Sequence, residues 1–353
     1  MPSLHDFNVE SFAQELDRLG ENAAHAPKIL RTFYAGDALD RLPILKSLRL
    51  KLATDYAQRP STMLTRHLSA DGTIKLLLAF DAGGTAEAVL MPTFRDGIAA
   101  GCVSSQIGCA MGCDFCASTK NGLQRNLTAA EIVDQFLQLR QASLSSSRRL
   151  KTVVFMGMGE PLHNLDHVIP AIERIAHPDM GALGWRQITI STVGIVPGID
   201  RLAETGLNVN LALSLHAPDD ATRAKIVPSN RRYPVADIIS AAKRYDARTN
   251  RVVNIEYCML GGVNDSDEQA HLLADLLNDF RAHVNLIPYN PIGMGVSGVT
   301  YIRPTNARVD AFLDILRNRK VVAHVRVTRG DDVAAACGQL RSQSNLKVVA
   351  AAK

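Results

Sequence analysis

Three closely spaced cysteines are the side chains of this sequence best suited to chemistry. Cys109, Cys113 and Cys116 form a C-x3-C-x2-C pattern. Thiolates are the usual protein ligands of iron–sulfur clusters, and this spacing lets three of them reach one cubane from a single loop. Because three ligands leave one of the four irons open, that iron can chelate the amino and carboxylate groups of a methionine moiety. The pattern therefore predicts a four-iron four-sulfur cluster that cleaves S-adenosylmethionine by one-electron reduction.

Zinc is the main alternative occupant of these cysteines. A structural zinc site usually has four protein ligands, and no fourth Cys or His follows at a suitable local spacing. We therefore expect an iron–sulfur cluster rather than zinc.

The composition is that of an ordinary globular protein. The chain has 353 residues, of which 46% are apolar, enough for one large domain and a smaller one. Its net charge of +4 is compatible with a nucleic-acid partner but does not require one. Residues 1–12 lack the apolar stretch of a signal peptide, and no apolar run approaches the roughly 20 residues of a membrane span. We expect a cytoplasmic protein without a membrane partner, whose six cysteines stay reduced and serve metal binding or catalysis.

Alternating strands and helices are expected to position the cysteine loop. From about Asp96 onward, apolar strand-like runs alternate with helical stretches, which indicates a parallel α/β sheet or barrel. One helix is expected to begin after Thr128, because Glu131 completes a capping box three residues on. Ligands of such folds bind at the C-terminal ends of the strands. The expected strands are 97–104, 152–156, 187–191, 208–215, 252–259, 284–287 and 324–328.

The same patterns divide the chain into four parts. Residues 1–60 are predicted to form a helical accessory domain, because apolar residues recur at helical spacing at positions 9, 12, 16 and 19 and again at 44, 45, 48 and 52. Residues 61–95 are predicted to form an antiparallel β-meander linker with tight turns between short strands. Residues 96–341 are predicted to form a partial (β/α) barrel, and 342–353 a loose tail.

Further polar candidates follow the expected strands. Glycines in Gly157-Met-Gly-Glu160 let the backbone approach a ligand closely, and Glu160 is suited to an ammonium group. Ser191 ends another expected strand and the run Ser214-Leu-His216 ends a third, where they can bind ribose or a carboxylate. Asn290 lies in a Tyr-Asn-Pro turn and can bind adenine or ribose. Taken alone, each also fits a plain turn or a satisfied polar group at a strand end.

Three more cysteines lie outside the cluster pattern. Cys102 ends an expected strand, Cys258 lies within another, and Cys337 lies in a run of small residues. Cysteine is often buried as a small apolar side chain. Their types and positions alone therefore favour core packing.

Several longer motifs are more specific than the cysteine pattern. They are Cys102-Val-Ser-Ser-Gln-Ile-Gly-Cys109, Arg125-Asn-Leu-Thr128, Met156-Gly-Met-Gly-Glu-Pro161, Leu213-Ser-Leu-His-Ala-Pro218, Asn285-Leu-Ile-Pro-Tyr-Asn-Pro291 and Thr328-Arg-Gly-Asp-Asp332 running to Cys337-Gly-Gln-Leu340. With them, residues 72–340 resemble the radical SAM superfamily and, within it, the RlmN/Cfr family of RNA adenine methyltransferases.

The resemblance implies the fold, the cofactors and the partners. The fold would be a radical-SAM partial (β/α) barrel of the TIM type, with a [4Fe-4S] cluster on Cys109, Cys113 and Cys116. The positions that match the family's S-adenosylmethionine contacts are Gly159, Glu160, Ser191, Ser214, Leu215, His216 and Asn290. The expected partners are 23S rRNA, tRNA and an electron donor such as flavodoxin, with the protein acting as a monomer.

The resemblance also assigns catalytic roles to Cys337, Cys102 and Glu87. Carbons C2 and C8 of adenine are poor nucleophiles, so a direct attack on the methyl group of S-adenosylmethionine is unfavourable. In this family Cys337 would instead be methylated and its methylene radical would add to the ring; Cys102 would then release the product by forming a disulfide with Cys337. Glu87 matches the proton acceptor, although a surface strand carboxylate is the plainer interpretation. Cys258 matches no such role and is expected in the core.

The sequence thus predicts methylation of C2 of an adenosine at the peptidyl-transferase centre of 23S rRNA, with tRNA as a further substrate. The nearest rival is C8-methylation of the same adenosine, but the cluster sequence Cys-Ala-Met-Gly-Cys resembles the C2 type. A rival of a different class is a non-catalytic, metal-containing RNA-binding protein.

Overall fold

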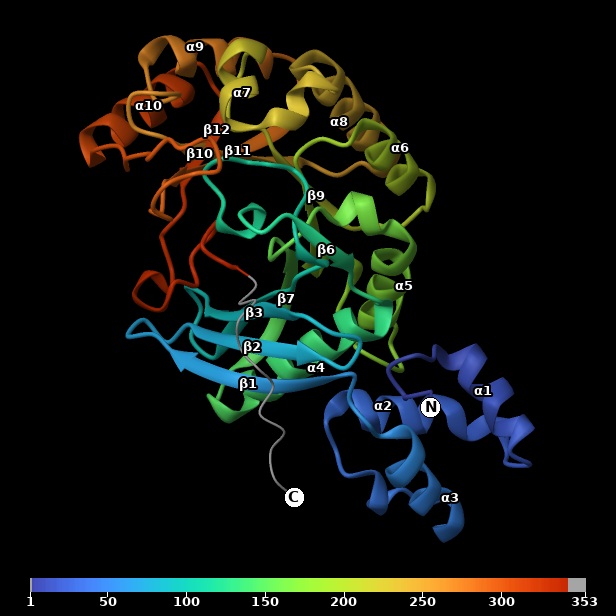
Figure 1. Cartoon of the computed structure of the whole chain (residues 1–353). Helices are drawn as coiled ribbons and strands as arrows, with labels where there is room; N and C mark the ends of the chain where they lie inside the picture. The colour runs from blue at the N-terminus through green and yellow to red at the C-terminus, as the bar shows by residue number, and fades with distance from the viewer. Residues whose placement is uncertain (1, 342–353) are drawn as a thin grey trace.

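A ten-stranded sheet forms the centre of the computed structural model, which describes residues 2–341 (Figure 1). In order across the sheet, the strands are β1 (Ser61–Leu68), β2 (Ile74–Phe80), β3 (Thr85–Pro92), β4 (Ile98–Cys102), β7 (Arg149–Phe155), β8 (Ile188–Thr192), β9 (Asn210–Ser214), β10 (Val253–Met259), β11 (Ala282–Pro288) and β12 (Val322–Val325). Neighbouring strands are parallel from β4 to β12. The pairs β1–β2, β2–β3 and β3–β4 are antiparallel.

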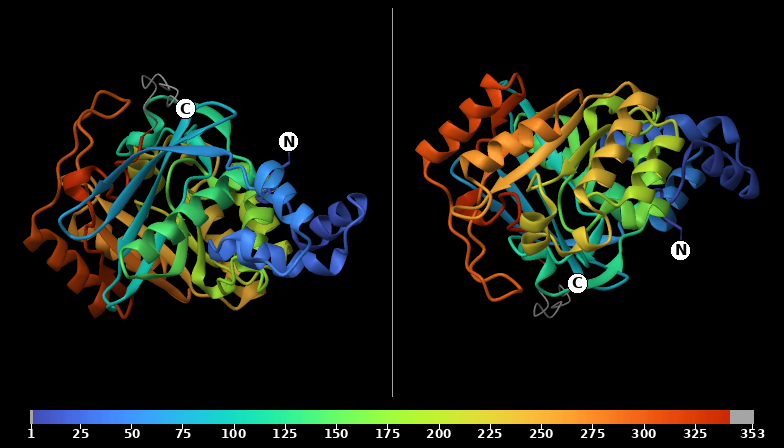
Figure 2. Two further views of the ribbon diagram at one scale, coloured as in Figure 1. Left: turned by 90° about the horizontal axis from the view of Figure 1, so that it is seen from below. Right: turned by 90° about the horizontal axis from the view of Figure 1, so that it is seen from above.

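Helices alternate with the parallel strands along the chain and cover the outside of the curved sheet (Figure 2). They are α4 (Ala129–Ser145), α5 (Leu165–Ala176), α6 (Val196–Glu204), α7 (Asp220–Ile226), α8 (Val235–Thr249), α9 (Asp267–Leu276) and α10 (Asn306–Asn318). The predicted fold class, a partial (β/α) barrel of the radical-SAM type, is confirmed.

The capping box predicted at Thr128 is present at the start of α4. The hydroxyl of Thr128 accepts a hydrogen bond from the Glu131 N–H (3.2 Å), and the Glu131 carboxylate accepts one from the Thr128 N–H (2.8 Å). Arg125 donates two further hydrogen bonds to this carboxylate, at 2.8 and 2.7 Å. The motif Arg125-Asn-Leu-Thr128 therefore fixes the start of a helix that packs on the sheet.

The N-terminal region is helical, as predicted, but the prediction of its second apolar face is only partly correct. It contains α1 (Val9–Arg18), α2 (Ala26–Ala35) and α3 (Lys46–Lys51). Phe12 and Leu16 are buried on the first face. On the second face Leu48 is buried, whereas Leu45 is 67% exposed. Leu45 precedes α3 as its N-cap residue, so the helical spacing assumed for it does not apply.

One buried polar residue near the N-terminus, His5, docks this region against the barrel. His5 is buried, and its Nε2 lies 3.2 Å from Oδ1 of Asp134 on α4. The other Asp134 oxygen accepts a hydrogen bond from the Ser61 hydroxyl at 2.5 Å. The N-terminal helices thus contact the face of the molecule that carries α4.

The predicted β-meander is present as β1, β2 and β3, and it continues the sheet of the barrel through β4. The division of the chain into four domains stays a prediction, and the predicted tail 342–353 lies outside the described residues. The last strand covers Val322–Val325 rather than 324–328, because Leu286–Val325 is the last residue pair between β11 and β12. Among residues 2–341, no helix has the length and apolarity needed to cross a membrane.

Candidate active site

The cluster loop, residues 109–122, lies between two short strands that the sequence did not indicate. These are β5 (Gln106–Gly108) and β6 (Leu123–Asn126), which pair antiparallel as a separate two-stranded sheet. Strands of three and four residues are too short to show an alternating pattern. Their pairing brings together the two ends of the cluster loop, where the Cys109 N–H donates a hydrogen bond to the Gly122 carbonyl (3.1 Å).

Asp114 fastens the cluster loop to the chain between β11 and α10. Its carboxylate accepts hydrogen bonds from the Ser297 N–H (2.7 Å), the Ser297 hydroxyl and the Tyr301 hydroxyl (2.7 Å). Its backbone N–H donates to the Ile226 carbonyl (2.9 Å). Asp114 lies directly after Cys113, so these contacts limit the movement of a cluster ligand.

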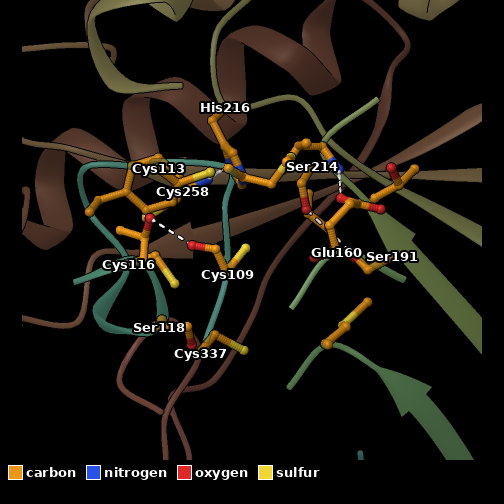
Figure 3. Close-up of a pocket in the computed structure, with 18 of the residues that line it drawn as sticks. Cys109, Cys113, Cys116, Ser118, Glu160, Ser191, Ser214, His216, Cys258 and Cys337 are labelled. Carbon is orange, nitrogen blue, oxygen red and sulfur yellow. Dashed lines mark hydrogen bonds between the residues drawn. The ribbon is translucent and has the colours of Figure 1, made fainter. Parts of the chain in front are cut away.

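The cluster loop opens onto a pocket at the C-terminal ends of the parallel strands, named here the central pocket (Figure 3). The pocket contains about 950 Å³ of space between protein atoms, part of it open to solvent. All three cysteines of the cluster loop line it, together with Cys337. Five of the seven predicted S-adenosylmethionine contacts line it as well: Gly159, Glu160, Ser191, Ser214 and His216.

The three thiols line one shared space, the central pocket. Among the described residues, no group of three or more Cys, His, Asp or Glu side chains is suited to holding a metal ion. A cubane is larger than one ion and takes thiolates from around its edge. Burial raises the pKa of Cys109 to about 12 and also raises those of Cys113 and Cys116, an effect that bound iron offsets by stabilising thiolates. The donor set and the available space fit the predicted cluster.

Gly159 and Glu160 form a tight turn at the wall of the central pocket. Gly159 has φ = +100°, and a Cβ there would lie 2.5 Å from Cβ of Gln106, so glycine is required on both counts. The buried Glu160 carboxylate accepts hydrogen bonds from the Leu162 N–H (3.0 Å) and the Val193 N–H (2.9 Å). Burial raises the pKa of Glu160 to about 7 in spite of these donors. A cationic ligand in the pocket would favour the ionised carboxylate.

The ends of β8 and β9 bring hydroxyl groups and an imidazole to the same pocket. The hydroxyls of Ser191 and Ser214 lie 3.2 Å apart. Nδ1 of His216 accepts a hydrogen bond from the Cys258 N–H (3.0 Å), and burial lowers the pKa of His216 to about 3. The imidazole is therefore neutral, with its proton on Nε2. Leu215 is fully buried and does not line the pocket.

Arg223, on α7, fixes these strand ends and was not identified from the sequence. Its fully buried guanidinium donates hydrogen bonds to the carbonyls of Val193 (2.5 Å) and Leu215 (2.8 Å) and to Oδ1 of Asn230 (2.9 Å). Arginine is rarely buried, and a seven-residue helix gives no pattern from which to infer that it faces inward. Its bonds bridge the turns that follow β8 and β9.

Replacing Arg223 with methionine is expected to lower the free energy of unfolding by about 3 kcal/mol, because it leaves buried acceptors unpaired at about 1–3 kcal/mol each. Denaturant unfolding of the purified proteins measures this. The matched control is Arg281→Met, which removes an exposed ion pair with Asp246 and should cost no more than about 1 kcal/mol. Equal losses in the two variants would contradict a structural role for Arg223.

Cys337 also lines a second pocket, named here the adjacent pocket, which contains Cys102. Cys102 is buried at the end of β4, Cys337 is exposed, and both are free thiols. The structure therefore places the two predicted relay cysteines in one pocket. Cys337 lines both this pocket and the one that holds the cluster cysteines, as do Met156 and Ile287.

Asn290 lies in the adjacent pocket rather than in the central one. Its Nδ2 donates a hydrogen bond to the Cys337 carbonyl (3.2 Å), and its Oδ1 accepts one from the Thr328 hydroxyl (3.2 Å). These bonds position the backbone of Cys337. The predicted contact of Asn290 with S-adenosylmethionine stays a prediction.

Glu87, on β3, is buried and lines neither pocket. Its carboxylate lies 3.1 Å from the Lys75 ammonium and accepts a hydrogen bond from the Arg341 N–H (2.9 Å). Lys75 also donates to the Ala334 carbonyl (3.1 Å). The ion pair thus holds the chain on both sides of Cys337, while a role for Glu87 as proton acceptor stays a prediction.

Comparisons with known proteins match nearly the whole chain. Residues 103–274 match the profile of the Radical SAM superfamily. The chain is 50% identical over 345 residues to the "Probable dual-specificity RNA methyltransferase RlmN 1" of Opitutus terrae, covering 97% of each chain. It is 44% identical over 332 residues to the "Probable dual-specificity RNA methyltransferase RlmN" of Thermus thermophilus, covering 94% of this chain and 92% of that one.

A solved structure agrees with these relatives. The crystal structure of a radical SAM methyltransferase from Sphaerobacter thermophilus superposes with a TM-score of 0.89 at 41% identity, covering 97% of this chain and 99% of that one. Fold and sequence therefore agree over the barrel, the β-meander and the N-terminal helices. The chain belongs to the RlmN family of radical SAM RNA methyltransferases.

Proposed function

We propose that the enzyme methylates carbon C2 of an adenosine in 23S rRNA and in tRNA, with Cys337 as the carrier of the methyl group. One observation carries the relay: Cys337 lines both pockets, between the cluster cysteines and Cys102. The relatives' names, which describe dual-specificity RNA methyltransferases, support RNA substrates of two kinds. Membership of an enzyme family contradicts the alternative of a non-catalytic RNA-binding protein.

The central pocket is proposed to hold both cofactors. Cys109, Cys113 and Cys116 would hold the [4Fe-4S] cluster, and Glu160 would accept a hydrogen bond from the methionine ammonium. When bound, the cluster and S-adenosylmethionine supply Cys337 with a methyl group and then a carbon radical that removes one hydrogen atom from it. The electron is proposed to come from a donor such as flavodoxin, and the protein to act as a cytoplasmic monomer.

The two relay cysteines are proposed to complete the transfer. The carbon on the Cys337 sulfur forms the new bond to the adenine ring. The ring radical then loses one electron, for which the oxidised cluster would be the acceptor, and one proton, for which Glu87 stays the predicted acceptor. The Cys102 thiolate then attacks the Cys337 sulfur. A sulfur–sulfur bond forms, the sulfur–carbon bond breaks with its electron pair on carbon, and this carbon takes up a proton to become the methyl group. A dithiol reductant must reopen the disulfide before the next turnover.

The position of the new methyl group is the direct test of this proposal. RNA treated with the enzyme is expected to contain 2-methyladenosine, because the cluster sequence Cys-Ala-Met-Gly-Cys resembles the C2 type. The treated RNA is digested to nucleosides. Chromatography with mass detection then identifies the product by comparison with 2-methyladenosine and 8-methyladenosine standards. The RNA substrate comes from a strain that lacks the gene, and the same RNA without enzyme treatment is the control. A dominant 8-methyl product would show that the C2 assignment is wrong.

A further inference from the structure

Arg326 is a charged side chain in the wall of the adjacent pocket, beside both relay cysteines. It follows β12 directly, and its backbone N–H donates a hydrogen bond to the Leu286 carbonyl on β11 (2.8 Å). This bond continues the pairing of β11 with β12 beyond the last strand residue. The backbone of Arg326 is therefore fixed to the sheet, while 37% of its side chain remains exposed.

Glu256, on β10, is the acidic partner of Arg326. Its Oε1 lies 3.8 Å from Nη1 of Arg326 and accepts a hydrogen bond from Nδ2 of Asn285 (2.8 Å). Glu256 is 3% exposed and lines the central pocket, and its Oε2 has no hydrogen-bond partner within residues 2–341. A separation of 3.8 Å is longer than a charge-assisted hydrogen bond, which measures about 2.7–2.9 Å. Glu256 therefore attracts the guanidinium by charge and accepts no hydrogen bond from the N–H groups of Arg326.

The charge of Arg326 acts on both sulfurs of the relay. Burial raises the pKa of Cys102 to about 12, the nearby Cys337 thiol adds to this rise, and Arg326 opposes it. Glu256, Cys337 and Cys102 in turn favour the charged guanidinium and raise its pKa against the effect of burial. Since the thiolate is the nucleophile in thiol exchange, a buried cysteine at this place needs a cation to react.

We propose that Arg326, held by Glu256, is the positioning residue that keeps the Cys102 thiolate directed at the sulfur of Cys337 during product release. This inference rests on the proposed relay and concerns its last step alone. In that step Cys102 supplies the electron pair of the new sulfur–sulfur bond. The pair of the broken sulfur–carbon bond passes to the carbon, which takes up a proton. Arg326 neither gains nor loses a proton; it offsets the charge of the attacking sulfur.

The Arg326→Met variant tests this role, because methionine keeps the bulk of the side chain without its charge. Full-length enzyme with a reconstituted cluster is incubated anaerobically with S-adenosylmethionine, a chemical reductant and a transcript of the 23S rRNA segment. We expect formation of 2-methyladenosine to fall about ten-fold or more, since each unit of rise in the pKa of Cys102 removes about ten-fold of its thiolate. Methylation of Cys337 and 5′-deoxyadenosine formation in the first turnover should persist. RNA should then accumulate in covalent linkage to the protein, visible on a denaturing gel.

Three further variants make the outcome specific. Arg326→Lys keeps the charge and should restore much of the release, whereas Arg281→Met, which removes a surface ion pair, should behave as the unmodified enzyme. Cys102→Ala should accumulate the same covalent species, and its failure to do so would count against the relay itself. If Cys102→Ala traps RNA but Arg326→Met releases product without an adduct, the role of Arg326 is wrong. It is equally wrong if Arg326→Met stops Cys337 methylation or raises the KM for RNA without trapping it.

Discussion

The Cys102→Ala variant is expected to hold its RNA substrate through a covalent bond. In the proposed relay Cys102 acts only in the last step, so methylation of Cys337, hydrogen abstraction and addition to the ring can all precede it. The resulting thioether between protein and adenine does not hydrolyse readily in water, and without the thiolate of Cys102 nothing breaks it. Protein on a denaturing gel should therefore carry RNA that disappears on ribonuclease treatment, while release of 2-methyladenosine stops.

Cys337→Ala is the matched control, because it stops the reaction before any bond to RNA forms. It should show neither adduct nor product. A packing role for Cys102, which is 7% exposed, predicts a different result: a loss of about 1 kcal/mol in unfolding free energy and no adduct. Full turnover by Cys102→Ala, or an adduct in Cys337→Ala, would contradict the relay.

Replacing any one of Cys109, Cys113 or Cys116 with alanine is expected to remove the cluster and with it all activity. Each is proposed to supply one of only three protein ligands, and two thiolates do not hold a cubane firmly. Iron content should fall from about four per chain toward zero, and 5′-deoxyadenosine formation should be abolished. Colorimetric iron analysis of anaerobically purified protein measures the first, and chromatography of the small-molecule products the second.

Cys258→Ala is the control for the cluster variants, because Cys258 lines the same pocket but is predicted to pack in the core. It should retain iron and visible absorbance. Unchanged iron in all three cluster variants would overturn the assignment of ligands. Loss of iron in Cys258→Ala alone would show that a different set of thiols binds the cluster.

The parts of the site that could be predicted depend on residues that lie close together in the chain. The spacing of Cys109, Cys113 and Cys116 lies within eight residues, and the capping box of Thr128 and Glu131 within four. The parallel strands were found because buried strands are continuous apolar runs between turns. The expected ligand face followed from the fold, and five of the seven predicted cofactor contacts line the central pocket.

The parts that could not be predicted depend on contacts between distant segments. Arg223 and Arg326 have ordinary local sequences, and only the fold shows that one is buried and the other shares a pocket with two cysteines. Cys102 and Cys337 are 235 residues apart in the chain, so their shared pocket follows from topology alone. The resemblance paired them, but no spacing rule within the sequence does so. Strands β5 and β6 could not be predicted because three or four residues are too few to show an alternating pattern.

The segment that carries Cys337 is fastened directly to the cluster loop by two hydrogen bonds. The Ala117 N–H donates a hydrogen bond to the Gly338 carbonyl (2.7 Å), and the Ser118 hydroxyl donates to the Leu340 carbonyl (2.6 Å). Both donors follow Cys116 immediately in the chain. The backbone beside Cys337 is therefore tied to the residues that follow Cys116. A displacement of either segment shifts the other, so the geometry of the cluster loop and the position of Cys337 are mechanically coupled.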